Sequence, residues 1–281
     1  MTVDSAPTRL HQQQAKVPVL MYHSVACESS PDFREFVLDP IDFADHMAAL
    51  SDAGYKPTTL SEYVGGASHS DTNSKQIVLT FDDAFVDFYS TVLPVLQKYS
   101  FPATIYVPTD FVGKTSRWLN REGEGNRQVM PWSAIKDIAD ASIEVGSHSC
   151  SHPQLDLIPP TGLRHEVLDS KRRIEDALQR AVRSFAYPFG YYNAATKAAV
   201  ATAGYESACA VRDLPSSRSD PYAISRWTMR HGMTAQQLID VLDVDSGKRA
   251  ELRSIARARA SWVLRRSGLK RRDNQPAGDI N

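Results

Sequence analysis

Cysteine is scarce in this chain, and neither sign of charge is in excess. The 281 residues include only three cysteines, Cys27, Cys150 and Cys209, which is an odd number and too few for a disulfide framework. Such scarcity is typical of a protein from a reducing compartment. The formal net charge is -1, so the chain lacks the basic surplus on which general nucleic-acid binding depends. We therefore expect neither structural disulfides nor a nucleic-acid partner.

Long apolar runs are missing as well. The sequence has no stretch of about 18 apolar residues, the minimum for a membrane-spanning helix. Its beginning, MTVDSAPTRLHQQQAKVP, has no apolar segment of the kind found in secretory signal peptides. We expect residues 1–16 to form a flexible tail and the protein to be cytoplasmic.

The remaining pattern is an alternation of strands and helices. Hydrophobic residues make up 42% and charged residues 23% of the chain, as in soluble globular proteins. The pattern predicts strands over residues 17–23, 77–81, 103–107, 143–146, 184–187 and 206–211. It predicts helices over residues 42–53, 87–99, 131–141, 161–181, 193–203 and 234–242. This order indicates one α/β domain over residues 17–245 with a parallel sheet, either closed as a barrel or open.

The last segment, residues 246–281, has a different composition. It is rich in lysine and arginine, and Leu252, Ile255, Trp262 and Leu269 would fall near one side of a helix. One interpretation is a basic amphipathic helix in peripheral contact with the inner face of an anionic membrane. The other is a helix packed on the domain with a solvated basic face.

Polar residues follow several predicted strands where those strands end. They are Tyr22-His23, Asp82-Asp83, His148 and Pro188-Phe189-Gly190. In parallel α/β folds, functional residues gather at the carboxyl ends of the strands. Asp82 and Asp83 are notable because two adjacent carboxylates repel each other, and burying either one unpaired is costly. We expect a cation nearby.

The segment GSHSCSHP supplies ligands for such a cation. His148 and His152 are four residues apart, so in a helical turn both imidazoles share one face. Two histidines and one carboxylate form a metal site with open positions. One aspartate of the pair would be a ligand and the other a general base. Each motif alone is more often incidental or a simple cap, but together they favour a metal centre. Zn²⁺, Co²⁺ and Ni²⁺ all suit these ligands, and Cys150 is better explained as a spacer than as a ligand.

Three motifs in this order resemble a known family. Thr80-Phe81-Asp82-Asp83, then His148-Ser-Cys-Ser-His152, then Tyr187-Pro188-Phe189-Gly190 resemble the motifs of polysaccharide deacetylases, the NodB-homology domains of carbohydrate esterase family 4. The resemblance spans roughly residues 17–242. The phrases LMYHSV and YPFGYYN are similar to the branch that contains the poly-N-acetylglucosamine deacetylases.

The resemblance implies a distorted (β/α) barrel with a divalent metal, usually zinc, and an N-acetylated saccharide as substrate. Asp83, His148 and His152 would bind the metal, and Asp82 would be the general base for a metal-bound water that attacks the acetamide. Tyr187, Pro188 and Phe189 of the third motif would line the site, with a backbone N–H near Phe189 at the oxyanion.

This sequence departs from the family pattern in three places. The late Leu-x-His motif that supplies the general acid is missing, so we favour His23 at the end of the first strand over His231. Ala186 stands where the family has an arginine that orients the catalytic aspartate, and Arg226 is a candidate to replace it. Ala84 stands where a glycine is usual.

Several aromatic residues are candidates for stacking on sugar rings, although aromatics more often fill cores. They are Tyr22, Trp132, Tyr191 and Trp227. The resulting prediction is a metal-dependent N-deacetylase acting on an oligosaccharide, a polysaccharide or a lipid-linked glycan. The alternatives are a deformylase or small-amide hydrolase on the same scaffold, and a non-catalytic carbohydrate-binding relative.

Overall fold

The structure, a computed structural model, describes residues 17–66, 75–211 and 220–243. The tail predicted over residues 1–16 and the basic segment predicted over residues 246–281 lie outside this part of the chain. None of the helices that the structure describes is long and apolar enough to cross a membrane.

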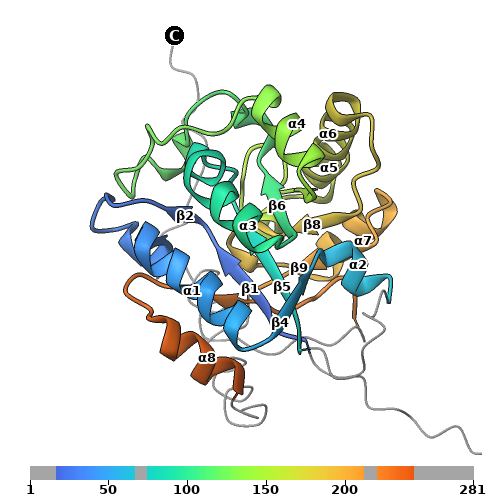
Figure 1. Cartoon of the computed structure of the whole chain (residues 1–281). Helices are drawn as coiled ribbons and strands as arrows, with labels where there is room; N and C mark the ends of the chain where they lie inside the picture. The colour runs from blue at the N-terminus through green and yellow to red at the C-terminus, as the bar shows by residue number, and fades with distance from the viewer. Residues whose placement is uncertain (1–16, 67–74, 212–219, 244–281) are drawn as a thin grey trace, which may run out of the picture.

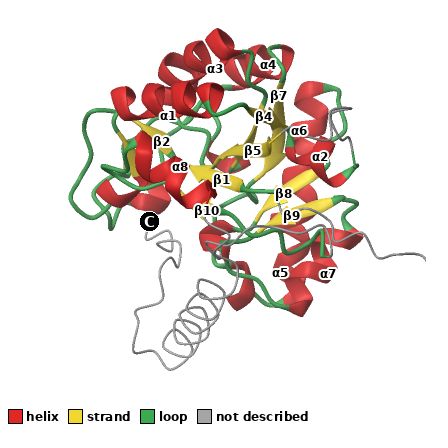
Figure 2. Ribbon diagram, turned by 60° about the horizontal axis from the view of Figure 1, so that its bottom comes forward, coloured by secondary structure: helices red, strands yellow, loops and turns green. Residues whose placement is uncertain are grey.

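A curled parallel sheet forms the centre of the protein, with helices around it (Figures 1 and 2). The strands run in the order β10-β1-β5-β6-β7-β8-β9, and β4 also pairs with β5. Their bounds are β1 Val19–Tyr22, β4 Tyr55–Thr58, β5 Lys75–Phe81, β6 Ala103–Val107, β7 Ile143–Ser147, β8 Ser184–Ala186, β9 Ser207–Cys209 and β10 Trp227–Thr228. All pairings in this sheet are parallel. The predicted distorted (β/α) barrel is thereby confirmed.

The segment that includes β10 links the two edges of the sheet. Ile224 forms a parallel bridge with Cys209 of β9, while Trp227 pairs with Leu20 of β1. A few residues of one segment thus span the gap between the edge strands. Arg226 lies in this segment, at the place where the curled sheet closes.

The helices follow the strands and cover the outside of the sheet (Figure 2). They are α1 Pro40–Asp52, α2 Leu60–Val64, α3 Leu93–Tyr99, α4 Trp132–Asp140, α5 Pro160–Arg164, α6 Ser170–Leu178, α7 Ala194–Thr202 and α8 Ala235–Asp243. The helices predicted over 87–99 and 161–181 each contain a π-helical turn, Phe88–Val92 and His165–Asp169. Two short strands, β2 Ser24–Val25 and β3 Val37–Leu38, form a separate pair beside the main sheet.

Alternate residues of the strands divide the core in two. Leu20, Leu79, Ile105 and Phe185 belong to a large cluster between the sheet and the helices. Their neighbours along the strands, including Val19, Val78, Tyr106 and Ala186, form a smaller cluster inside the curl. This division follows from the two-residue period of a strand. Functional side chains must therefore sit on the inner face or at the strand ends.

Candidate metal centre

Asp82 and Asp83 lie directly after β5, where the chain turns away from the sheet. Asp82 remains attached to the strand edge because its N–H donates to the Tyr22 carbonyl at 2.9 Å. Asp83 and Ala84 then adopt positive φ angles of 72° and 51°. Ala84 holds this conformation at the position where the family has a glycine, which favours it more easily. Both carboxylates are buried, each with 3% exposure.

Asp83, His148 and His152 come together at the carboxyl ends of β5 and β7. One ligand atom from each lies within 4.8 Å of the others. Asp83 Oδ1 is 3.6 Å from His148 Nε2 and 3.3 Å from His152 Nε2. All three side chains are buried. One carboxylate oxygen and two imidazole nitrogens at these separations can hold a divalent metal.

The hydrogen bonds of these residues fit that role. His148 Nδ1 donates to the Ala186 carbonyl at 2.8 Å, which leaves the lone pair of Nε2 facing the cluster. Asp83 Oδ1 is buried and accepts no hydrogen bond from the residues that the structure describes. An orphaned buried carboxylate oxygen is costly unless a cation compensates it. The donor set therefore fits zinc, cobalt or nickel.

The helical turn expected for residues 148–152 is wrong. The segment is an irregular loop, in which Ser149 and His152 have positive φ angles of 66° and 56°. Ser149 Oγ accepts a hydrogen bond from the His152 N–H at 3.1 Å, so the side chain closes the loop in place of a helical bond. The two imidazoles converge because of this turn rather than through helical periodicity.

Arg226 reaches Asp82 across the inside of the curled sheet. Its Nη1 lies 2.6 Å from Asp82 Oδ1 and its Nη2 lies 2.8 Å from Asp82 Oδ2. The guanidinium stacks 5.5 Å from the Tyr106 ring centroid and has 0% exposure. Gly146 makes room for that ring, because a Cβ there would lie 2.5 Å from Tyr106 Cε1. Arg226 thus supplies the positive charge beside Asp82 that Ala186, at the position of the family's arginine, cannot supply.

The electrostatics of the two aspartates follow from their partners. Burial favours the neutral form of Asp82, but the Arg226 guanidinium, with a smaller effect from the His148 side chain, outweighs it and holds the pKa well below the ordinary value. The pKa of Asp83 is also lowered, because His152 and His148 outweigh burial. Burial lowers the pKa of His148 to about 4 against the attraction of Asp82. The site therefore holds carboxylates and neutral His148 near neutral pH, the forms that bind a metal.

His23 lies at the site and His231 is engaged elsewhere. His23 Nε2 is 4.0 Å from Asp82 Oδ2, and its ring packs against Phe36. Its Nδ1 is buried without a hydrogen bond to the described residues. Burial lowers the pKa of His23, with Asp82 opposing. His231 uses both ring nitrogens, one with the Val37 carbonyl and one with Arg34 Nε.

The third motif is only partly at the site. Phe189, in a turn with φ of 60°, places its ring 4.9 Å from that of His152. Pro188 is buried beside it. Tyr187 packs in the large outer cluster, and its hydroxyl donates to the Tyr222 carbonyl. Trp227 also packs against the outer cluster, because it follows Arg226 on a strand and faces the opposite way.

One aromatic residue at the site was missed from the sequence. Trp118 stacks on His152, with ring centroids 5.1 Å apart, and also packs against Phe85 and Phe111. It is buried with 6% exposure, and its Nε1 has no hydrogen-bond partner among the described residues. It lies in a 3₁₀ turn, Arg117–Leu119, within a long connection that carries no periodic signal. Of the residues proposed to stack on sugars, Tyr22 is buried in the outer cluster, and Tyr191 stacks on Phe189.

Comparisons with known proteins show similar sequences and a similar fold. Residues 69–208 match the family profile described as polysaccharide deacetylase. The Bacillus subtilis protein YxkH, named for the same family, is 29% identical over 225 residues, covering 79% of this chain and 75% of that protein. The poly-β-1,6-N-acetyl-D-glucosamine N-deacetylase of Escherichia coli is 25% identical over 139 residues, 46% of this chain and 20% of that longer protein. The structure of the Streptococcus pyogenes deacetylase PplD in complex with acetate superposes with a TM-score of 0.70 at 24% identity, covering 82% of this chain and 99% of that one.

Proposed function

This chain belongs to the polysaccharide deacetylase family, and on that premise we propose that it removes the acetyl group from an N-acetylated saccharide in a metal-dependent hydrolysis. The observation that carries the proposal is the pairing of two adjacent carboxylates with different partners. Asp83 belongs to the cluster with His148 and His152, while Asp82 is held by Arg226. A relative that acts on poly-β-1,6-N-acetyl-D-glucosamine supports the saccharide class.

Asp83, His148 and His152 would hold the metal. When bound, the ion supplies Lewis acidity toward water and toward the amide carbonyl. Asp83 contributes the negative charge of the ligand set, and the Ala186 carbonyl fixes the tautomer of His148. Such partners orient ligating imidazoles and raise their basicity.

Asp82 would be the general base. Its pKa is held low, so the carboxylate is ionised and able to accept a proton from the attacking water. Two nitrogens of the Arg226 guanidinium donate to the two oxygens of Asp82, which restrains the orientation of the carboxylate. Asp82 Oδ2 also lies 3.8 Å from His148 Nε2, beside the cluster.

His23 would deliver a proton to the leaving amine. Its Nε2 lies 4.0 Å from Asp82 Oδ2, so the proposed proton donor and the proposed proton acceptor are neighbours at the site. The backbone N–H of Phe189 would stabilise the oxyanion of the tetrahedral intermediate. The Phe189 ring lies 4.9 Å from that of His152, which places this residue beside the cluster.

The test combines metal analysis with product release. The purified full chain is assayed for bound zinc, cobalt and nickel, and for acetate released from β-1,4- and β-1,6-linked N-acetylglucosamine oligomers and from lipid-linked sugars. We expect Asp83→Ala to lose both metal and activity, and Asp82→Asn to keep metal and lose turnover. A fully active Asp82→Asn variant would overturn the roles given to the pair. Formate release from N-formyl substrates without acetate release would indicate a deformylase instead.

A further inference from the structure

The loop that carries the two histidines has an unfavourable backbone. Ser149 and His152 both have positive φ, a region that residues other than glycine rarely adopt. Such a conformation persists only when its surroundings enforce it. The loop must therefore be held by contacts strong enough to keep His148 and His152 converged.

Glu166 provides a large part of that support from behind the loop. Its Oε2 accepts hydrogen bonds from the N–H groups of Cys150 and Ser151, both at 2.9 Å. Its Oε1 accepts a third bond from Ser151 Oγ at 2.7 Å. Glu166 is buried with 6% exposure and lies in the π-helical turn His165–Asp169. Successive backbone N–H groups on one carboxylate form a rigid anion nest.

The other supports of the loop do not replace Glu166. The Thr109 and Asp110 N–H groups donate to the Ser149 and Cys150 carbonyls, which satisfies the acceptors of the loop but not its donors. His148 is fixed by the Ala186 carbonyl. The Nδ1 of His152 has no such partner among the described residues. The position of His152 depends on the loop backbone and on its ring contacts with Trp118 and Phe189.

We propose that Glu166 is a positioning residue that presets the His148–His152 loop for metal binding. It contacts the backbone between the two ligands and neither imidazole, so it acts through the loop. This inference rests on the proposed function, since it assumes that the cluster holds a metal. Residues that orient metal ligands in this way change metal affinity by about 10- to 100-fold when they are removed.

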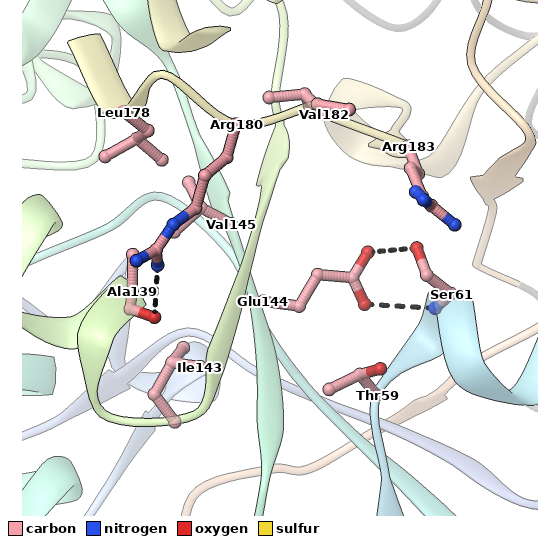
Figure 3. A pocket seen from close by; sticks show the side chains of 11 residues that line it. Thr59, Ser61, Ala139, Ile143, Glu144, Val145, Leu178, Arg180, Val182 and Arg183 are labelled. Carbon is pink, nitrogen blue, oxygen red and sulfur yellow. Dashed lines mark hydrogen bonds between the residues drawn. The ribbon is translucent and has the colours of Figure 1, made fainter.

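Glu144 offers a matched control away from the histidine loop. It lies near the start of β7, the strand that leads to His148, but at the opposite end of the sheet. Like Glu166, it accepts hydrogen bonds from backbone N–H and hydroxyl groups, in this case one N–H and three hydroxyls: Ser61 N, Ser61 Oγ, Thr104 Oγ1 and Ser184 Oγ. Figure 3 shows Glu144 with its oxygens on Ser61, beside a cavity of about 210 Å³.

The experiment measures zinc affinity by competition with a chromophoric chelator, together with the Tm of the metal-free protein, for the full chain and its variants. We expect Glu166→Ala to weaken zinc binding about tenfold or more. Glu166→Gln should restore affinity to within about threefold of wild type, because the amide oxygen can still accept both N–H groups. Glu144→Ala should lower the Tm of the metal-free protein and leave zinc affinity unchanged.

The result that overturns the inference is a Glu166→Ala variant with wild-type zinc affinity, whatever its Tm. Equal losses in Glu166→Ala and Glu166→Gln would also overturn it, because they would show that the charge matters rather than the geometry. If Glu166→Ala does not fold, Ser151→Ala serves in its place, because it removes one of the three bonds and should weaken zinc binding. Unchanged zinc affinity in Ser151→Ala then overturns the inference. A wild-type chain that binds no metal overturns the proposed function itself, which separates the two failures.

Discussion

Arg226 and Asp82 form a two-point ion pair inside the curled sheet, with N–O distances of 2.6 and 2.8 Å. The two residues come from strands β10 and β5 or their ends, and β1 lies between those strands. Both side chains are buried. A buried pair of this kind contributes chiefly because removing one partner leaves the other charge uncompensated.

Replacing Arg226 with Met should therefore have two effects. The free energy of unfolding should fall by roughly 3–5 kcal/mol, because Asp82 loses its buried partner. The pKa of Asp82 should rise, since burial then acts without the opposing guanidinium. If Asp82 is the general base, the acidic limb of the pH–kcat/KM profile should move to higher pH. Arg183→Met is the control, because Arg183 is exposed and lies 3.7 Å from Glu206. An unchanged acidic limb would contradict the prediction.

The two candidate proton donors can be separated by a matched pair of substitutions. His23→Gln should lower kcat by about 10²- to 10⁴-fold, the usual contribution of a positioned acid or base. It should leave bound metal unchanged, because His23 does not belong to the cluster. His231→Gln should affect kcat little, since His231 is occupied by the Val37 carbonyl and Arg34. The reverse order of effects would assign the acid to His231.

Asp87, which lies outside the candidate metal centre, should make the free energy of unfolding depend on pH. Burial raises its pKa from 3.8 to about 6, although Ser24 and Arg127 oppose the shift. The folded state then keeps this proton up to about pH 6, while the unfolded chain releases it near pH 4. The contribution of Asp87 is therefore favourable below pH 4 and is lost as the pH rises to 6, a change of roughly 3 kcal/mol.

Urea unfolding of the wild type and Asp87→Asn at several pH values checks this sign. The stability of Asp87→Asn relative to wild type should rise between pH 4 and 6. Asp140→Asn serves as the control, because Asp140 is exposed and pairs with Arg180 at the surface. A relative stability of Asp87→Asn that falls over this interval would refute the assignment.

Metal addition should stabilise the chain through the cluster. At a free zinc concentration of 100 times Kd, the expected gain is about 2.7 kcal/mol, visible as a concentration-dependent rise in Tm. Asp83→Ala should abolish that rise. Cys150→Ser should keep it, because the Cys150 thiol is engaged with the His165 carbonyl and is a spacer between the ligands. Loss of the rise in Cys150→Ser would instead indicate that the thiol binds the metal.

The fold and the cluster of candidate metal ligands were largely predictable because their signals are local. Apolar runs such as 77–81 and 103–107 mark strands buried on both faces, and the polar residues after them identify the functional edge. The strand β4 was missed, because Lys56 and Pro57 interrupt its apolar pattern. Pro57 still pairs with Ile77 at the beginning of β5, so the tertiary pairing outweighs the weak local preference.

Other parts of the site could not be read from local patterns. Arg226 was a candidate only because Asp82 needed a cation, and its reach across the sheet depends on how the sheet curls. Trp118 and Glu166 lie far from the motifs in sequence and meet the histidine loop only in three dimensions. The loop itself was predicted as a helical turn, since the spacing of two histidines gives no information about positive φ angles.

The position of Arg226 also has a consequence for synthesis on the ribosome. By the time His152 has emerged, the nascent chain holds every candidate metal ligand. Asp82 is paired with a residue that follows it by 144 positions, which corresponds to roughly 7 to 30 s of elongation after Asp82 itself is added. Until then the sheet edge at β1 is open and the carboxylate has no guanidinium. A fragment that stops before residue 224 would thus contain all three candidate ligands in an unclosed sheet, and the segment with β10 would complete both the sheet and the Arg226–Asp82 pair.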